Sequence, residues 1–194
     1  MALTIFVYLA ALDRLVFPED PVAINFSIRK HCSGFLVAHH PNKNAETRYN
    51  IYVDGLADLW EARKKERKSW IPGNRRGHRL VKATREELLV SLAAHEVRHR
   101  VQSDCSPKKF SPKSANLVKD KFIKSIIRFE ALVLEEDRKT YNKENKSKFF
   151  IRGRINRKEF DANVIERLIA SKIHRKNAYS LREETASIIK MSAP

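Results

Sequence analysis

The chain has 194 residues, which is enough for one domain of ordinary size with a real hydrophobic core. Apolar residues make up 42% of it, which excludes a largely disordered chain, and only two cysteines (Cys32 and Cys105) argue against a disulfide scaffold or a cysteine-rich zinc fold. Lys and Arg outnumber Asp and Glu by 39 to 23, so the formal charge of +16 predicts attraction to polyanions. The low cysteine content fits a reducing compartment, and we expect a cytoplasmic protein.

Residues 1–12 form an apolar run that ends at Asp13 and Arg14. A membrane span needs about 20 apolar residues, and a signal peptide begins with positive charge, so this run fits neither pattern. We expect a buried strand or helix here. No other segment is apolar enough over a sufficient length, so we expect no membrane span.

Residues 22–56 carry strand signals. Val22–Lys30 alternates apolar and polar residues, and Gly34–His40 and Arg48–Val53 are two further short runs bounded by turn-forming residues. Together these runs predict a small, mostly antiparallel sheet.

The pattern then becomes helical. A helix is predicted over Leu56–Trp70, and a second one begins after Thr84, because Thr84 and Glu87 have the spacing of a capping box. The apolar periodicity of this second helix continues to about Gln102. The segment Ser106–Ser114 contains two Ser-Pro steps, which disfavour helix, and we expect it to end there.

The last part of the chain predicts three more helices. One covers Asn116–Lys139, one starts near Lys158, and a short last one opens at a second capping box, Ser180–Glu183. Strands therefore dominate residues 1–56 and helices dominate 57–194, and this order is typical of an α+β fold. We expect a single domain over the whole chain.

The segment His95-Glu-Val-Arg-His99 is an H-E-x-x-H motif within the second helix. Residues four apart share a helix face, so both imidazoles can reach one Zn²⁺ at about 2.0–2.1 Å. Glu96 is rotated by roughly 100° from His95, beside the metal, where a general base can take a proton from a zinc-bound water. The simpler alternative is a pair of core histidines beside a surface glutamate. The position of the motif within a capped, apolar-faced helix favours the metal site.

A catalytic zinc site needs a third protein ligand and an open position for water. Gln102 and Cys105 stand where the metzincin type has a glycine and a third histidine, which excludes that type. Glu159 and Asp161 are the two main candidates. They lie two residues apart and face nearly opposite ways on a helix, so only one of the two can bind the ion. Three other carboxylates are expected on a solvated helix face: Glu130, Glu135 and Glu136.

Two segments carry a resemblance to known peptidases. The segment Glu159-Phe-Asp-Ala-Asn163 resembles the E-x-x-A-D/N segment of gluzincins such as the CAAX-prenyl-protease group and the ImmA/IrrE-like peptidases. The segment from His95 to Gln102 resembles the H-E-x-R-H-x-x-Q helix of small phage-like or bacterial metallopeptidases. The resemblance implies a zincin-like fold and a Zn²⁺ ion held by His95, His99 and Glu159. It also implies that Asn163 hydrogen-bonds a ligand histidine.

These assignments predict a zinc-dependent metallopeptidase that acts on a peptide or protein. Zinc would polarise the scissile carbonyl, and Glu96 would pass a proton from the bound water to the leaving amine. Tyr141 and His174 are candidates for stabilising the oxyanion by residue type alone. The edge of the strand Gly34–His40 is a candidate for pairing with an extended peptide.

The alternative hypothesis is a basic protein that binds nucleic acid and has no catalytic activity. The basic segments of the sequence are its basis. Basic residues crowd the range 63–79 around Trp70, and Ser106-Pro-Lys-Lys109 and Ser111-Pro-Lys113 resemble short basic motifs of linker histones. Such residues would neutralise phosphates without reading bases. A solvated basic face is the simpler interpretation of the same residues.

Overall fold

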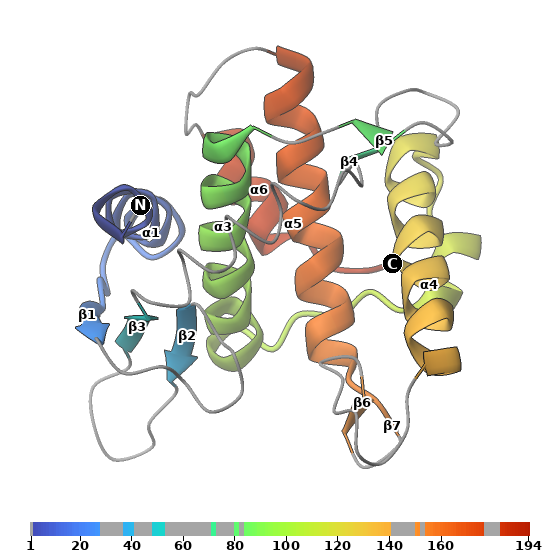
Figure 1. Cartoon of the computed structure of the whole chain (residues 1–194), viewed down its shortest axis with the longest axis horizontal. Coiled ribbons are helices and arrows are strands. Elements are labelled where there is room, and N and C mark those ends of the chain that lie inside the picture. The colour runs from blue at the N-terminus through green and yellow to red at the C-terminus, as the bar shows by residue number, and fades with distance from the viewer. Residues whose placement is uncertain are drawn as a thin grey trace.

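The computed structural model describes residues 2–27, 37–40, 48–52, 71–72, 80–81, 84–140, 150–151, 154–176 and 183–194. Helices α3 (Arg85–Asp104) and α5 (Arg157–Lys176) lie side by side at its centre. Helix α1 (Ala2–Val16) and a small sheet lie beyond α3, and α4 (Lys121–Thr140) packs against the other side of α5 (Figure 1). The described chain is therefore an α+β structure in which helices dominate.

The apolar N-terminal run folds as helix α1. Ile5, Leu9, Leu12 and Val16 recur at helical spacing and are all buried, so α1 presents one apolar stripe to the core. Asp13, in the last turn of α1, is buried as well. Asp13 accepts a hydrogen bond from the Tyr49 hydroxyl at 2.7 Å, which ties α1 to the sheet.

The sheet has three strands: β1 (Ala23–Ser27), β2 (Val37–His40) and β3 (Arg48–Tyr52). Their order is β1-β3-β2, with β1 parallel and β2 antiparallel to β3. The expectation of a mostly antiparallel sheet was wrong for the β1–β3 pair. Alternation of apolar residues indicates which face of a strand is buried, but it does not determine which neighbour the strand pairs with.

Four short strands form two further antiparallel pairs that the sequence patterns did not predict. One pair joins β4 (Ile71–Pro72) and β5 (Leu80–Val81), and the other joins β6 (Phe150–Ile151) and β7 (Arg154–Ile155). The helix predicted over Leu56–Trp70 lies outside the described residues.

Helix α3 begins at the predicted capping box. The Thr84 hydroxyl accepts from the backbone N–H of Glu87 at 3.2 Å, and the Glu87 carboxylate accepts from the N–H of Thr84 at 2.7 Å. The helix ends two residues later than expected, at Asp104. Ser106 then adopts φ 45°, the left-handed conformation that commonly follows a helix.

The later helices follow the expected order. After the 3₁₀ helix η1 (Pro112–Asn116), α4 starts five residues later than predicted, because the Asp120 carboxylate accepts from the N–H groups of Phe122 and Ile123. Helix α6 (Glu183–Lys190) is the short last helix, and the serine of its expected capping box lies outside the described residues.

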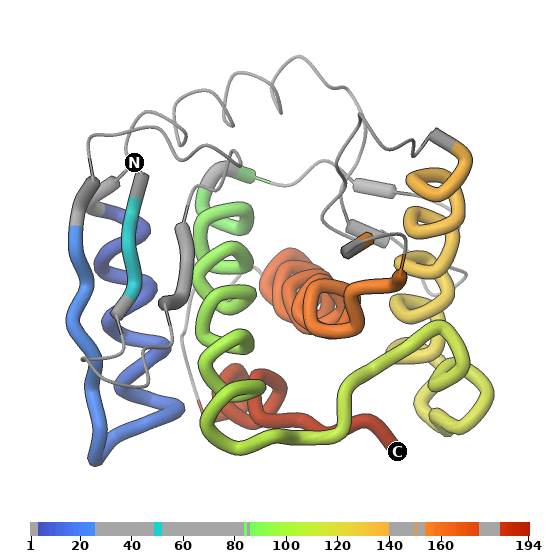
Figure 2. The backbone as a smooth tube through the Cα atoms, turned by 90° about the horizontal axis from the view of Figure 1, so that it is seen from below, coloured from blue at the N-terminus to red at the C-terminus, as the bar shows by residue number. Residues whose placement is uncertain are grey.

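The described elements share one hydrophobic core, in which α3 lies between α1 and α5. Figure 2 shows α5 end-on between α3 and α4, which agrees with the arrangement in Figure 1. None of the helices in the described part of the chain combines the length and the hydropathy that a bilayer crossing requires.

Candidate metal centre

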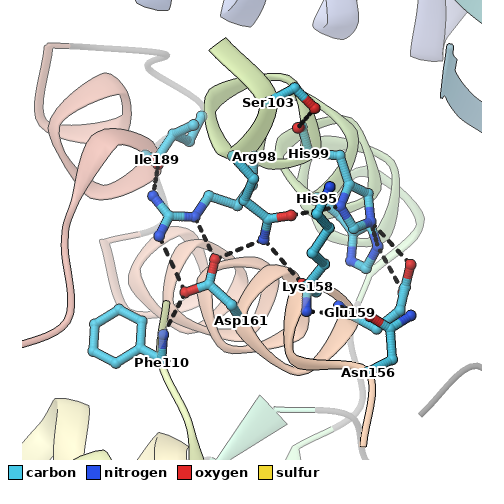
Figure 3. A network of polar contacts seen from close by, with 11 residues as sticks. His95, Arg98, His99, Ser103, Phe110, Asn156, Lys158, Glu159, Asp161 and Ile189 are labelled. Carbon is cyan, nitrogen blue, oxygen red and sulfur yellow. Dashed lines mark hydrogen bonds and ion pairs between the residues drawn. The ribbon is translucent and has the colours of Figure 1, made fainter. Parts of the chain in front are cut away.

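His95 and His99 lie one turn apart on the face of α3 that meets α5 (Figure 3). Their Nε2 atoms are 3.1 Å apart, and the two rings meet edge to face with centroids 4.7 Å apart. This contact confirms that the two histidines share one helix face, as their spacing predicts. The capping box and the buried apolar residues of α3 hold this part of the helix in place.

Glu159 reaches the two histidines from the first turn of α5. Its Oε1 lies 3.1 Å from His99 Nε2, and its Oε2 lies 3.5 Å from His95 Nε2. Asn156 precedes the helix, and its side-chain oxygen accepts from the N–H groups of Lys158 and Glu159, which orders the turn that carries the carboxylate. The structure thus brings together the three residues that the sequence proposed as ligands.

The spacing of these atoms is that of ligands around one ion. Two atoms bound to zinc at about 2.0–2.1 Å with tetrahedral angles lie roughly 3.3 Å apart. The two Nε2 atoms are 3.1 Å apart, and each of them has one of the two Glu159 oxygens nearby, Oε1 at 3.1 Å from His99 and Oε2 at 3.5 Å from His95. One ligand atom from each of the three residues lies within 4.8 Å of the others, so together they could hold one metal ion.

Each histidine has a partner on its other ring nitrogen. The Glu166 carboxylate lies 2.9 Å from His95 Nδ1, and the Gln102 side-chain oxygen lies 3.0 Å from His99 Nδ1. Because a carboxylate only accepts, His95 must donate through Nδ1, and Nε2 is the nitrogen that faces the cluster. Such contacts fix the tautomer and orientation of metal-binding histidines.

Sequence reasoning missed Glu166. The signal was available, since Glu166 follows Glu159 by seven residues, or two helical turns, and so lies on the same face of α5. Asn163 is buried four residues after Glu159. The orienting contact that we expected from Asn163 stays a prediction, while the described contact on His95 Nδ1 comes from Glu166.

The electrostatics of the cluster favour an added positive charge. Burial alone would lower the pKa of His95, but the hydrogen bonds and charges of Glu159 and Glu166 outweigh it and raise this pKa to about 10. Burial alone would raise the pKa of Glu159, but hydrogen bonds to His95 and His99 lower it well below its ordinary value. Without a metal, the site therefore holds a proton, and a metal ion would take the place of that proton.

Asp161 faces away from the cluster, as its spacing from Glu159 predicts. Its carboxylate accepts from Arg98 Nε at 2.7 Å and from Arg98 Nη2 at 3.1 Å, and both side chains are fully buried. Arg98 also donates to the Ile189 carbonyl at 2.7 Å, so this contact joins α3, α5 and α6. Asp161 is therefore committed to a structural ion pair, and it leaves the ligand position to Glu159.

The other rivals lie elsewhere in the described structure. Glu130 was expected on a solvated face, but it is fully buried and pairs with Arg167 of α5, because α4 packs against α5. Glu135 is paired with Arg138 at the surface. Cys105 is exposed beyond the end of α3.

The candidates for stabilising an oxyanion gain no support. His174 pairs with Glu87 at 3.0 Å. It follows Glu159 by fifteen residues on α5, which corresponds to about 22 Å along the helix, so it does not reach the cluster. Tyr141 lies outside the described residues.

Of the two basic regions, most of residues 63–79 lies outside the described residues. The segment Ser106–Ser114 is described and is not helical until η1 begins. Phe110 anchors it, since its side chain is buried and its N–H donates to Asp161 at 2.7 Å, while Lys108 and Lys113 are exposed.

Neither a family model nor any curated protein or solved structure matches this chain. What the protein does is therefore inferred from its residues and their geometry.

Proposed function

We propose that the protein is a zinc-dependent peptidase. His95, His99 and Glu159 would hold the zinc ion, which would supply the Lewis acid that activates a water molecule for attack on a peptide carbonyl. One observation carries this proposal: two imidazole Nε2 atoms 3.1 Å apart and the carboxylate of Glu159 converge on one point. Two imidazole nitrogens and a carboxylate are the ligand types that bind catalytic zinc.

Three protein ligands leave one tetrahedral position for water, as in catalytic rather than structural zinc sites. Water can reach the cluster, since the side chains of His99 and Glu159 are 17% and 15% exposed. Bound to zinc, a water molecule has a pKa near 7 and can act as a nucleophile at neutral pH.

Glu96 is the general base of the proposed reaction. It directly follows His95, and the helical rotation of about 100° per residue places it beside the ligands rather than among them. Its side chain is buried. Burial and Asp13 raise the pKa of Tyr49, and the negative charge of Glu96 adds to this rise.

The sheet offers an edge for an extended substrate. Among the described strands, β2 pairs with β3 alone, and it packs beside α3, which carries both histidines. A peptide strand added to the outer edge of β2 would run past the helix that holds the zinc. An edge strand, a helix with two ligand histidines and a third ligand from a later helix together support a zincin-like fold.

Metal content per chain is the first test. We expect mass spectrometry of purified wild-type protein to find about one zinc ion, and His99→Ala to retain little. His174→Ala is the matched control, because this histidine pairs with Glu87 far from the cluster and its loss should leave the metal in place. A wild-type protein that stays free of metal after incubation with zinc and desalting would rule the proposal out. If a different divalent ion were found in the site, the proposed hydrolase activity would stand and only the identity of the metal would change.

A further inference from the structure

We propose that Gln102 is the positioning residue of His99: it holds the proton of His99 on Nδ1 and so presents Nε2 to the metal. The inference rests on the proposed metal site and adds a residue to which sequence reasoning gave no role. Gln102 lies one turn after His99 on α3 and is almost fully buried. It has no charge, so its effect on the imidazole depends on which end of its amide faces the ring.

Two acceptors determine the orientation of this amide. Gln102 Nε2 lies 2.9 Å from the Lys158 carbonyl oxygen and 2.7 Å from Asp161 Oδ2. Both neighbours only accept hydrogen bonds, so the NH₂ group, which supplies two donors, must point toward them. The amide oxygen is then left to face His99 Nδ1, at 3.0 Å.

This orientation decides the tautomer of His99. An amide oxygen can only accept, so Nδ1 must carry a proton, and Nε2 is the ring nitrogen left to bind a metal ion. A rotated amide would set an N–H group against Nδ1 and move the ring proton to Nε2, where it would block the metal. Glu166 acts in the same sense on His95, but through a carboxylate.

Asp161 anchors the arrangement. Its carboxylate is fully buried and accepts from Arg98 Nε and Nη2, from the N–H of Phe110 and from Gln102 Nε2. These donors come from α3 and from the segment after it, whereas Asp161 belongs to α5. The residue rejected as a ligand thus fixes Gln102, and Gln102 fixes the ligand His99.

The test uses Gln102→Met, which keeps a side chain of similar length and removes both polar groups. Zinc affinity is measured by competition with a chelator, and the ring nitrogen atoms of the zinc-loaded protein are followed by ¹⁵N NMR. In wild type we expect His99 to show a protonated Nδ1 and a coordinated Nε2. In Gln102→Met we expect zinc affinity to fall about 10–100-fold, with loss of the protected Nδ1 proton of His99. Ser103→Ala is the control, because its hydroxyl bonds the backbone oxygen of His99 and not the ring.

Gln102→Glu is the second variant, and it keeps the test decisive if Gln102→Met does not fold. It retains an acceptor for His99 Nδ1, so we expect the Nδ1 proton to survive even though two carboxylates then meet at Asp161. Zinc affinity equal to wild type in Gln102→Met, or loss of the Nδ1 proton in Gln102→Glu with zinc still bound, would overturn the inference and leave the metal site standing. Failure of wild type to bind zinc would overturn both.

Discussion

Two clusters of charged side chains lie on the two flanks of α3, and they differ in how their charges are satisfied. Toward α1, Arg100 donates to both oxygens of Asp13 at 2.8 Å and also to Asp20 and Asp104. Toward α5, His95, His99 and Glu159 converge on one point, where without a metal the positive charge comes from a proton on His95.

The Arg100 cluster is complete in itself, whereas the histidine cluster is a candidate site for an added metal ion. The guanidinium of Arg100 has a protein partner for each of its nitrogen atoms, and it is closed to solvent. The histidine cluster is held by hydrogen bonds to Glu166 and Gln102, but His99 and Glu159 stay partly exposed, and the three residues could hold a metal ion. A buried network that is complete stabilises the fold, whereas one that is completed only by an added cation indicates a binding site.

The largest expected effect concerns the reaction itself. Glu96→Gln removes the general base and leaves all three ligands, so we expect hydrolysis of a peptide library to slow about 10²–10⁴-fold while the zinc content stays near one ion per chain. Initial rates and metal content are measured on the same preparation. Undiminished hydrolysis in this variant would show that another group takes the proton.

The Arg100 cluster should respond in stability and not in metal binding. Arg100→Met leaves the buried Asp13 carboxylate without its cation, and we expect the free energy of unfolding to fall by about 3–5 kcal/mol in urea titrations. Folded protein should still bind one zinc ion. Arg138→Ala, which breaks a solvent-exposed pair with Glu135, is the control and should hardly move the urea midpoint. Equal effects of the two variants would remove the distinction drawn between the clusters.

The histidine cluster should respond in metal affinity and little in stability. Glu166→Ala removes the acceptor of His95 Nδ1, and we expect the dissociation constant of zinc to rise about 10–100-fold. Glu166→Gln keeps an acceptor without the charge and should fall between wild type and Glu166→Ala. Asn163→Ala is the comparison that tests the family-derived expectation. A greater loss of affinity in Asn163→Ala than in Glu166→Ala would restore the orienting role to Asn163.

The two histidines of the cluster could be placed together from the sequence because the information is local. The spacing of His95 and His99 follows from helical periodicity, and the capping box at Thr84 defines where that helix begins. Glu159 was found through the resemblance of its segment and through its opposition to Asp161 on one helix, and the structure brings it to the histidines.

The partners of the ligands depend on tertiary packing and could not be predicted in this way. Glu166 meets His95, and Asp161 meets Arg98 and Gln102, only because α3 and α5 pack with one particular register. Glu130 shows the same limit, since its helix pattern does not reveal that Arg167 of α5 covers it. The parallel pairing of β1 with β3 is likewise a choice of neighbour that strand periodicity does not contain.

The smallest expected effect is the pH dependence of metal binding. In the metal-free protein, Glu159 and Glu166 raise the pKa of His95 to about 10, so at neutral pH His95 carries a proton that zinc must displace. The lowered pKa of Glu159 keeps its carboxylate ionised, so it contributes no proton. We therefore expect about one proton from His95 to be released per zinc ion, and an affinity that rises about tenfold per pH unit from pH 7 toward the pKa of His95. Calorimetry at about pH 6 in two buffers of different ionisation enthalpy counts the proton, because a zinc-bound water with a pKa near 7 still keeps its own proton there. The Arg100 cluster contains no such group, so Arg100→Met should leave this count unchanged, whereas a wild-type titration that releases no proton would show that His95 is already neutral before the metal arrives.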